Sequence, residues 1–174
     1  MMRFNRGDAT ALRDIYGLYK DDLVTLASAL LHDKTSAEDA VHDVFAKLLD
    51  RQKVLKISQS LRQYLMTAVA NAARQRYRLG KKTAEVPLDS ESIPESQTQS
   101  PPESAMLLDE QQQHLSSALS ALPYEQREVI LLRHFSDLKF KTIASLQDVS
   151  LNTVQGRYRY GLDKLRSLLN GELL

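Results

Sequence analysis

The chain of 174 residues has no cysteine and no tryptophan, and it contains only six glycines and five prolines. The absence of cysteine excludes disulfides, iron-sulfur clusters, thiolate zinc sites and cysteine nucleophiles. No apolar run approaches the roughly 20 residues that a membrane-spanning helix needs. The amino terminus has no apolar segment before its first aspartate, so we expect no secretion signal. We therefore expect a cytoplasmic protein that does not insert into a membrane.

Motifs for enzyme chemistry are missing as well. Neither the GxGxxG nor the GxxxxGK[ST] phosphate-binding loop occurs in the sequence. The four histidines are scattered and no two of them stand at metal-ligand spacing with a carboxylate: His32, His42, His114 and His134. We expect no metal site, no cofactor and no catalytic activity.

Two adjacent segments each lack charge of one sign, acidic in the first and basic in the second, although the net charge of the whole chain is only +1. Residues 51–82 contain nine Lys or Arg and no acid, whereas residues 83–110 contain seven acids and no base. A basic block of this kind is the usual electrostatic footprint of phosphate binding, and the alternative is a solvated helix face. The segregation suggests that different segments meet different partners.

What the chain does have is helical periodicity. Apolar residues recur every three or four positions over 9–31, where the pair Asp21 and Asp22 suggests a junction between two helices. A helix over 36–50 is expected to be capped by Thr35 or Ser36 and to bury Ala37, Val41, Val44, Phe45 and Leu48.

A third helix is expected to begin after Ser60 and to end near Gly80. Its predicted buried side consists of Leu61, Tyr64, Leu65, Ala68 and Ala72. Its polar positions Asn71, Arg74 and Arg78 are spaced i, i+3 and i+7, so they share a different face.

The stretch rich in Ser, Pro, Gln and acids that follows has no apolar period and is interpreted as a linker. Helical patterns then resume at 105–121, at 123–134, at 138–147 with Asp137 as its cap, and after Ser150. The predicted fold is all-α, with two small helical domains, 1–82 and 105–174, joined by a flexible acidic linker over 83–104.

The last two helices have the pattern of a helix-turn-helix, in which the second helix enters the major groove of DNA. Its apolar side is expected to contain Leu151, Val154, Tyr158, Leu162, Leu165 and Leu169. The opposite side carries Arg, Asn and Gln, which can pair with guanine and adenine edges. The alternative is an ordinary amphipathic helix of a bundle.

Residues 122–166, "LPYEQREVILLRHFSDLKFKTIASLQDVSLNTVQGRYRYGLDKLR", resemble region 4 of extracytoplasmic-function (ECF) sigma factors of the sigma-70 family. Upstream, "SAEDAVHDVFAKLLD" and "LRQYLMTAVANAARQRYR" are similar to two helices of region 2 of that family. With "ALRDIYGLYKDDLVTLASALL" before them, the resemblance covers nearly the whole chain in family order.

The resemblance implies a transcription initiation factor that binds core RNA polymerase and promoter DNA, and that an anti-sigma factor controls. It implies minus-35 binding by Lys139, Asn152, Thr153, Gln155, Arg157, Arg159, Tyr160 and Lys164. It implies minus-10 binding by Arg51, Lys53, Lys56, Arg62, Asn71, Arg74 and Arg78. The beta-prime clamp of the polymerase would meet Glu38, Asp39, His42 and Asp43, and the beta-flap would meet the helix around 125–133.

Several positions depart from the family pattern. They are Tyr64 for Trp, Gln75 for Asp, Asp148 for Gly, Gln155 for Lys, Gly156 for Ser, Tyr160 for Arg and Gly161 for Ala. Each glycine within a helix costs roughly 0.5 to 1 kcal/mol relative to alanine, so the last helix is expected to be soft.

Two other functions remain open at the level of sequence. A sigma-like decoy that titrates an anti-sigma factor would lack cationic faces, and the nine bases of 51–82 argue against it. A helix-turn-helix repressor would bind palindromic DNA as a dimer, but no segment has the pattern of a dimerisation domain.

Overall fold

The computed structural model describes residues 9–51, 60–84 and 103–171, and all regular structure within these ranges is helical. The helices are α1 (Ala9–Leu31), α2 (Lys34–Arg51), α3 (Leu61–Ala84), α4 (Glu103–Ser120), α5 (Tyr124–His134), α6 (Phe140–Gln147) and α7 (Leu151–Leu169). The predicted all-α class is thereby confirmed.

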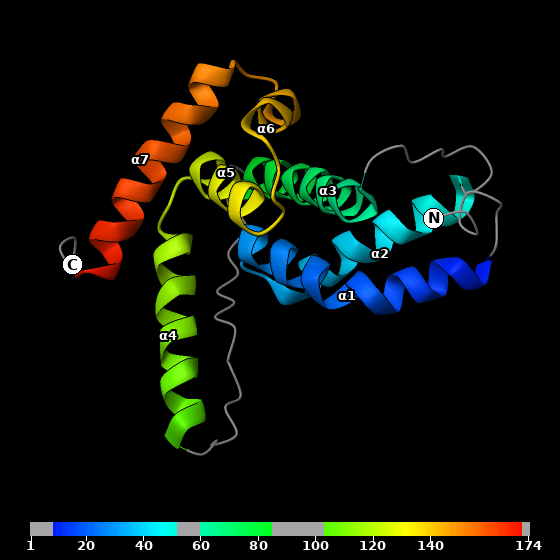
Figure 1. The fold of residues 1–174 in the computed structure, drawn as a ribbon, viewed down its shortest axis with the longest axis horizontal. Coiled ribbons are helices and arrows are strands. Elements are labelled where there is room, and N and C mark those ends of the chain that lie inside the picture. The colour runs from blue at the N-terminus through cyan, green and yellow to red at the C-terminus, as the bar shows by residue number, and fades with distance from the viewer. Residues whose placement is uncertain (1–8, 52–59, 85–102, 172–174) are drawn as a thin grey trace.

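Helices α1, α2 and α3 pack side by side as a bundle (Figure 1). Leu23, Leu26 and Leu30 of α1 are fully buried in its core. All five residues predicted to point inward from α2 are buried as well. The suggested junction at Asp21 and Asp22 is wrong, because α1 runs through both residues as one helix.

Helix α2 begins at Lys34, two residues before the predicted start at residue 36. The backbone N–H of Ser36 donates to Asp33 Oδ2 at 2.8 Å, so Asp33 caps the helix in place of Thr35 or Ser36. Hydrogen bonds from the Ser36 side chain and backbone hold the pKa of the Asp33 carboxyl below its ordinary value. Thr35 and Ser36 themselves lie inside the first turn of the helix.

The buried side of α3 is wider than predicted. Leu65 is fully buried as expected, and so are the unpredicted Met66, Val69, Ala70 and Ala73. The other predicted residues, Leu61, Tyr64, Ala68 and Ala72, are half-buried against the same core. The reason is that α3 lies against both α1 and α2, and two neighbouring helices cover a broader stripe than one.

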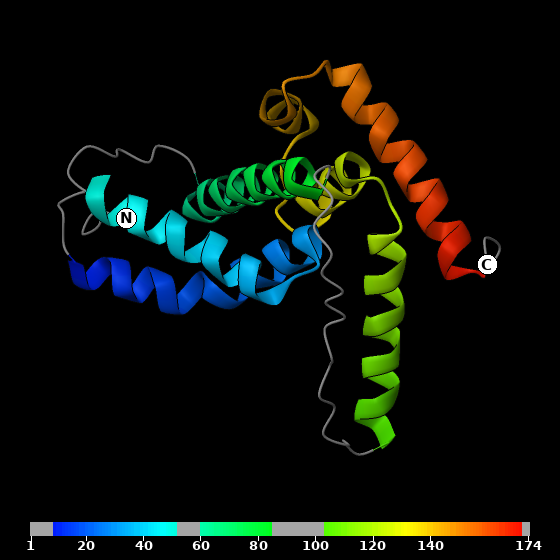
Figure 2. The same cartoon turned by 180° about the vertical axis from the view of Figure 1, so that it is seen from behind.

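The carboxy-terminal helices form a second unit, in which α5, α6 and α7 contact one another and α4 contacts α7. The amino-terminal end of α4 extends away from the remainder of the molecule, as Figure 1 and Figure 2 both show. A small core joins α4, α5 and α7 through Ala118, Leu119, Leu122, Ile130 and Leu165.

The two units are in contact through α5, which lies beside α1 and α3 (Figure 2). The main core is continuous across this contact, since it includes Leu30 and Leu65 of the first bundle together with Leu132 and Ile143 of the second. The sequence left the relative position of the two units open. The structure brings polar residues from both of them into one contact.

Candidate nucleic-acid interface

Helices α6 and α7 form a helix-turn-helix with a tight turn at Asp148. Asp148 adopts the left-handed conformation, with φ 54° and ψ 50°, which aspartate supports better than most residues. The backbone N–H of Val149 then donates to Ala144 O at 3.1 Å, and this bond closes the turn. Asp148 thus fills the position that glycine commonly holds in such turns.

The α7 cap confirms the prediction for Ser150, whose side chain accepts a hydrogen bond from Thr153 N at 3.1 Å. The α6 cap does not follow the prediction for Asp137. Leu138 N donates back to Leu132 O at 3.1 Å, which turns Asp137 to a φ of 53° and delays the start of α6 until after Lys139.

The two faces of α7 are strongly different. Val154 and Leu165 are buried, Tyr158 and Leu162 are half-buried, and Ile143 and Ala144 of α6 are buried in the same packing. Leu151 was predicted on the apolar side but is 43% exposed, because burial along α7 begins only at Val154.

The polar face of α7 is open to solvent. The exposed members of the predicted set are Lys139 just before α6, and Asn152, Thr153, Gln155, Arg159, Tyr160 and Lys164 on α7. The Arg159 guanidinium lies 5.0 Å from the centre of the Tyr160 ring, a cation-π distance. A cavity of about 380 Å³ opens beside Gly156, between Phe140 and Arg159. The structure therefore leaves the predicted duplex-reading residues of α7 exposed, with the exception of Arg157, and Lys139 is exposed just before α6.

A second cationic face lies on α3. Asn71 and Arg78 are exposed and line a cavity of about 430 Å³ together with Arg74, Gln75 and Leu79. Arg62 at the start of the helix donates to Phe135 O at 2.8 Å and also pairs with Asp22 at 3.4 Å. Lys53 and Lys56 of the predicted set lie outside the described residues, as does the side chain of Arg51.

Arg74 is withdrawn from that face by an ion pair with Glu128 of α5. Its Nη2 lies 2.7 Å from Glu128 Oε1, and only 11% of the Arg74 side chain and 1% of the Glu128 side chain are exposed. Arg74 Nη1 donates to Asn71 Oδ1 at 3.1 Å and also to Leu146 O. The guanidinium is therefore fully engaged within the protein.

The network continues to α7 through Gln147. Gln147 Nε2 donates to Glu128 Oε2 at 2.7 Å, and Arg157 Nη1 donates to Gln147 Oε1 at 2.7 Å. Arg157 is consequently half-buried, while its neighbour Arg159 is exposed. One chain of hydrogen bonds thus links predicted DNA contacts of both units.

Tyr124 and Arg127 of α5 complete the contact. The Tyr124 ring stacks on the Tyr77 ring of α3, with 4.1 Å between centroids and 16° between planes. Arg127 is 4% exposed and its Nη2 donates to Leu30 O at 2.8 Å. Burial raises the pKa of the Tyr124 hydroxyl, as does the adjacent Glu128 carboxylate, and burial lowers the pKa of the Arg127 guanidinium.

Comparison with known proteins identifies this architecture. Residues 15–83 match the family model for sigma-70 region 2, and residues 112–165 match that for sigma-70, region 4. CarQ of Myxococcus xanthus, an RNA polymerase sigma factor, is 26% identical over 99% of this chain and 97% of its own length. SigW of Bacillus subtilis, an ECF RNA polymerase sigma factor, is 26% identical over 94% of this chain and 91% of its own. The chain belongs to the ECF sigma-70 family.

Two solved structures share the fold of this sigma factor. The sigma factor RpoE from Bartonella quintana, in complex with the anti-sigma factor NepR, has a TM-score of 0.64 at 23% identity over 93% of this chain and 98% of that one. CnrH in complex with the cytosolic domain of CnrY has a TM-score of 0.66 at 20% identity over 98% and 94%. The expectation of a sigma factor fold with regions 2 and 4 is confirmed.

The acidic residues of α2 lie at the surface of region 2 of this sigma factor. Asp39, His42 and Asp43 are exposed, and Glu38 is half-buried. Asp43 Oδ2 lies 2.6 Å from Arg76 Nη2 in an exposed ion pair, and the His42 ring lies 6.0 Å from that of Tyr16. Asp39 is the exposed acid of this set that forms no ion pair among the described residues.

Sequence reasoning did not single out Glu128 or Arg127 as partners of region 2. One signal was available, because both residues fall between Tyr124 and Leu131 at the helical spacing of an apolar stripe. Charged residues within an apolar stripe are seldom buried unless they are paired. The apolar stripe therefore predicts that Glu128 has a buried basic partner, but it does not identify which of the nine bases in 51–82 is that partner.

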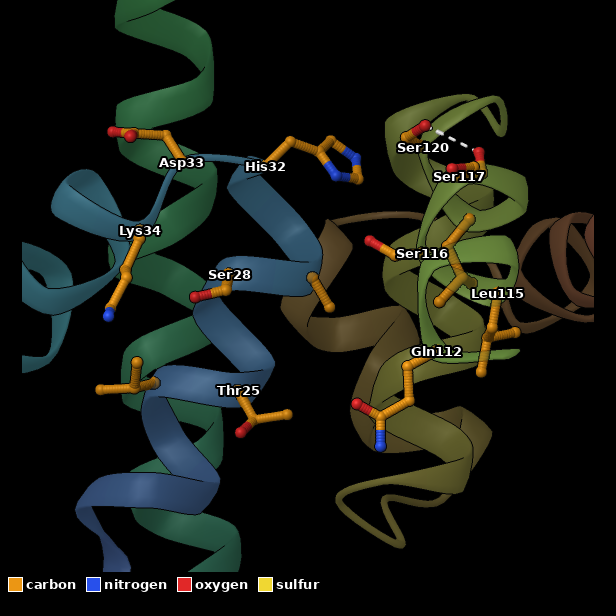
Figure 3. Close-up of a pocket in the computed structure, with 13 residues that line it drawn as sticks. Thr25, Ser28, His32, Asp33, Lys34, Gln112, Leu115, Ser116, Ser117 and Ser120 are labelled. Carbon is orange, nitrogen blue, oxygen red and sulfur yellow. Dashed lines mark hydrogen bonds between the residues drawn. The ribbon is translucent and has the colours of Figure 1, made fainter. Parts of the chain in front are cut away.

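A further cavity of about 920 Å³ separates the carboxyl end of α1 from α4 (Figure 3). Its walls carry mostly small polar side chains, including Ser28, Ser116 and Ser117, and no predicted DNA or polymerase contact lines it. Within the described residues no cluster of His, Asp and Glu is arranged to hold a metal ion. None of the described helices combines the length and apolar character needed to cross a membrane.

Proposed function

We propose that this sigma factor reads the minus-35 duplex through the exposed face of α7. The observation that carries the proposal is the division of α7 into a docked apolar side and an open side with Arg159, Asn152 and Gln155. Arginine pairs with guanine, and asparagine and glutamine pair with adenine, in the major groove. Lys139 and Lys164 are also exposed and are candidates for phosphate contacts.

The minus-10 element would be held by region 2. Arg78 and Asn71 are exposed next to a cavity on α3, and the basic connection of 51–60 leads into the same helix. Cations beside an open groove suit a single strand, whose phosphates they neutralise while its bases unstack. Arg62 and Arg74 would join this surface once they leave their partners in region 4.

Promoter binding requires the two units to separate. The names of the two elements place them about 25 base pairs apart, which is roughly 85 Å of duplex. A compact chain of this length has a radius of gyration of about 16 Å. The closed arrangement cannot span both elements, so region 4 must move away from region 2 when the polymerase and the promoter are bound.

Core polymerase is the proposed agent of that separation. Asp39, with Glu38, His42 and Asp43 around it, would contact the beta-prime clamp, and the segment 125–133 would contact the beta-flap. That segment is α5, which packs on α1 in the closed arrangement. Binding of α5 to the beta-flap would therefore draw region 4 off region 2.

The remaining proposals concern the regulation of the protein, its cellular location and the linker between its two regions. An anti-sigma factor is the proposed regulator, because two solved structures that share this fold are complexes, one with the anti-sigma factor NepR and one with the cytosolic domain of CnrY. The protein would act in the cytoplasm, without catalysis of its own and without a cofactor. The residues 83–104 would serve as the linker between region 2 and region 4.

The direct test is run-off transcription with purified core polymerase and a library of genomic promoter fragments. We expect this protein to direct transcription from a small subset of the fragments, with a minus-35 and a minus-10 motif in common. Equal transcription with and without the protein on every fragment would reject the proposal in favour of the decoy.

A further inference from the structure

Glu128 is the one buried acid among the described residues, and it lies where region 4 meets region 2. Burial of a carboxylate is costly unless opposite charge and hydrogen bonds surround it. Here the charge comes from across the contact, since Arg74 approaches both of its oxygens, with Nε at 3.1 Å and 3.2 Å. Gln147 and the Tyr124 hydroxyl, the latter at 3.4 Å, complete its hydrogen bonds.

The ion pair between Arg74 and Glu128 resembles the contact that an arginine makes with a phosphate group. A carboxylate and a phosphate present two oxygens to the fork of a guanidinium in the same way. Arg74 belongs to the predicted minus-10 surface, between the exposed Asn71 and Arg78. While Glu128 holds it, the guanidinium cannot hold a DNA phosphate.

An entrance for a phosphate lies next to the pair. A cavity of about 180 Å³ is lined by the two partners and by three further cations, Arg78, Lys81 and Arg157. Glu125 is the other acid on its wall. A strand that follows Arg78 would bring its phosphates to the edge of the contact, where the cations attract them.

We propose that Glu128 acts as an internal competitor of DNA phosphate for Arg74 and so keeps the free protein closed. This inference rests on the proposed function, because it assumes that Arg74 meets the promoter. Through Gln147 the same carboxylate also holds Arg157 of α7. Closure therefore withdraws a DNA contact from each unit, and release of Glu128 returns both of them.

The test measures binding of a forked minus-10 fragment to the full-length protein without polymerase. Glu128→Gln keeps the shape of the side chain and removes its charge. If the open form is about a tenth of the free protein, opening raises the apparent affinity about tenfold. The matched control is Glu110→Gln, which makes the same change at an exposed position of α4 that does not line this cavity, and it should change the affinity less than about twofold.

A distance measurement reports closure itself. Because the chain has no cysteine, Lys47→Cys and Asp163→Cys introduce a unique pair of labelling sites on exposed positions of α2 and α7. We expect the distance between labels to increase in Glu128→Gln and to stay unchanged in Glu110→Gln. Tyr77→Ala, which removes the stack on Tyr124, opens the contact by a route that leaves Glu128 intact.

The outcomes separate the inference from the proposed function. The inference is supported if Glu128→Gln and Tyr77→Ala both open the contact and both bind DNA more tightly than the wild-type protein. Opening without any gain in DNA affinity overturns it, and so does an unchanged distance in a folded Glu128→Gln. If wild-type protein and Glu128→Gln both direct promoter-selective run-off but bind the forked fragment with equal affinity in the absence of polymerase, only the proposed competition between Glu128 and DNA phosphate is wrong. If neither protein directs selective run-off, the proposed function is wrong.

Discussion

Two glycines of α7 meet different surroundings, although both stand within the helix. A Cβ added at Gly161 would come within 3.0 Å of Ile130 Cδ1 and 3.1 Å of Gln126 Cβ, so this glycine lets α7 approach α5 closely. A Cβ added at Gly156 would meet only Tyr160 Cε2, at 4.0 Å. The prediction of a softer helix therefore applies to Gly156, while Gly161 has a packing role that local sequence could not reveal.

The two positions give a paired prediction for stability. Gly156→Ala should stabilise the protein by about 0.5 to 1 kcal/mol, since alanine is the better helix former. Gly161→Ala gains the same propensity but must push Ile130 and Gln126 aside, and overpacking of this kind costs about 1 to 3 kcal/mol. Urea unfolding should show Gly161→Ala to be the less stable variant by about 1 to 3 kcal/mol, which is the overpacking cost. Equal stabilisation by the two substitutions would show that Ile130 and Gln126 of α5 move aside at little energetic cost.

At the scale of helices, local signals were sufficient for some boundaries and insufficient for others. The Ser150 cap was predictable because the hydrogen bond to Thr153 involves one turn of chain. The Asp137 cap was wrong because Leu138 bonds back to Leu132, a closure that depends on how α5 ends. The buried stripe of α3 was predicted too narrow, since its width is decided by two neighbours that sequence periodicity does not identify.

For α7, Arg159 is the cleanest test of promoter reading because it is exposed, whereas Arg157 is held by Gln147. Arg159→Ala should weaken minus-35 binding by about 1 to 3 kcal/mol, the usual cost of a lost base contact, and relax the preference at one position. Binding to core polymerase should be unchanged. Filter binding of a minus-35 duplex series measures both effects.

The matched control is Arg166→Ala, which removes the same charge from the same side of α7 two turns later, roughly 10 Å along the axis. It should lower the affinity for all sequences alike, through phosphate attraction alone. If Arg159→Ala behaves as Arg166→Ala does, the face of α7 does not read bases.

For α2, Asp39 is the exposed acid of the predicted polymerase-binding set that forms no ion pair among the described residues, so reversal of its charge should leave the fold intact. Asp39→Lys should reduce assembly with core polymerase at least about tenfold, because like charges placed in an interface cost several kcal/mol. Asp50→Lys, three turns further along α2 and also exposed, should assemble normally. Competition against a labelled sigma factor measures assembly, and equal behaviour of the two variants would remove Asp39 from the polymerase contact.

At the scale of the whole molecule, the division into region 2 and region 4 followed from periodicity and composition, but their contact did not. The contact is made by guanidinium groups that donate to carbonyls and to Glu128, over separations of 54 to 97 residues. Pairs so distant in sequence leave no periodic trace in one chain. Two of these arginines, Arg62 and Arg74, belong to the set that the family resemblance implies for minus-10 binding, and that role stays a prediction.

The free energy of unfolding should fall in mild acid. His32, at the end of α1, has a pKa below its ordinary value of 6.5, because burial and the nearby Arg127 disfavour its protonated form. The unfolded chain then binds more protons than the folded one, so the free energy of unfolding falls as the pH drops below about 6.5. Urea unfolding at about pH 7.5 and about pH 5.5 measures the difference.

His32→Asn is the control for this prediction. His32 has a φ of 57°, and asparagine adopts that conformation readily without titrating. The variant should lose part of the acid sensitivity and keep the stability found at about pH 7.5. An unchanged pH dependence would assign the effect to other groups.

The continuous core has a consequence for how the molecule melts. Since Leu30, Leu132 and Ile143 belong to one buried cluster, the closed protein cannot lose region 4 without exposing apolar surface of region 2. The free protein should unfold in a single cooperative transition, with slow hydrogen exchange in α5 as well as in α1. If polymerase draws the units apart as proposed, each unit retains only its own core, and the two units should then unfold independently in the assembled enzyme.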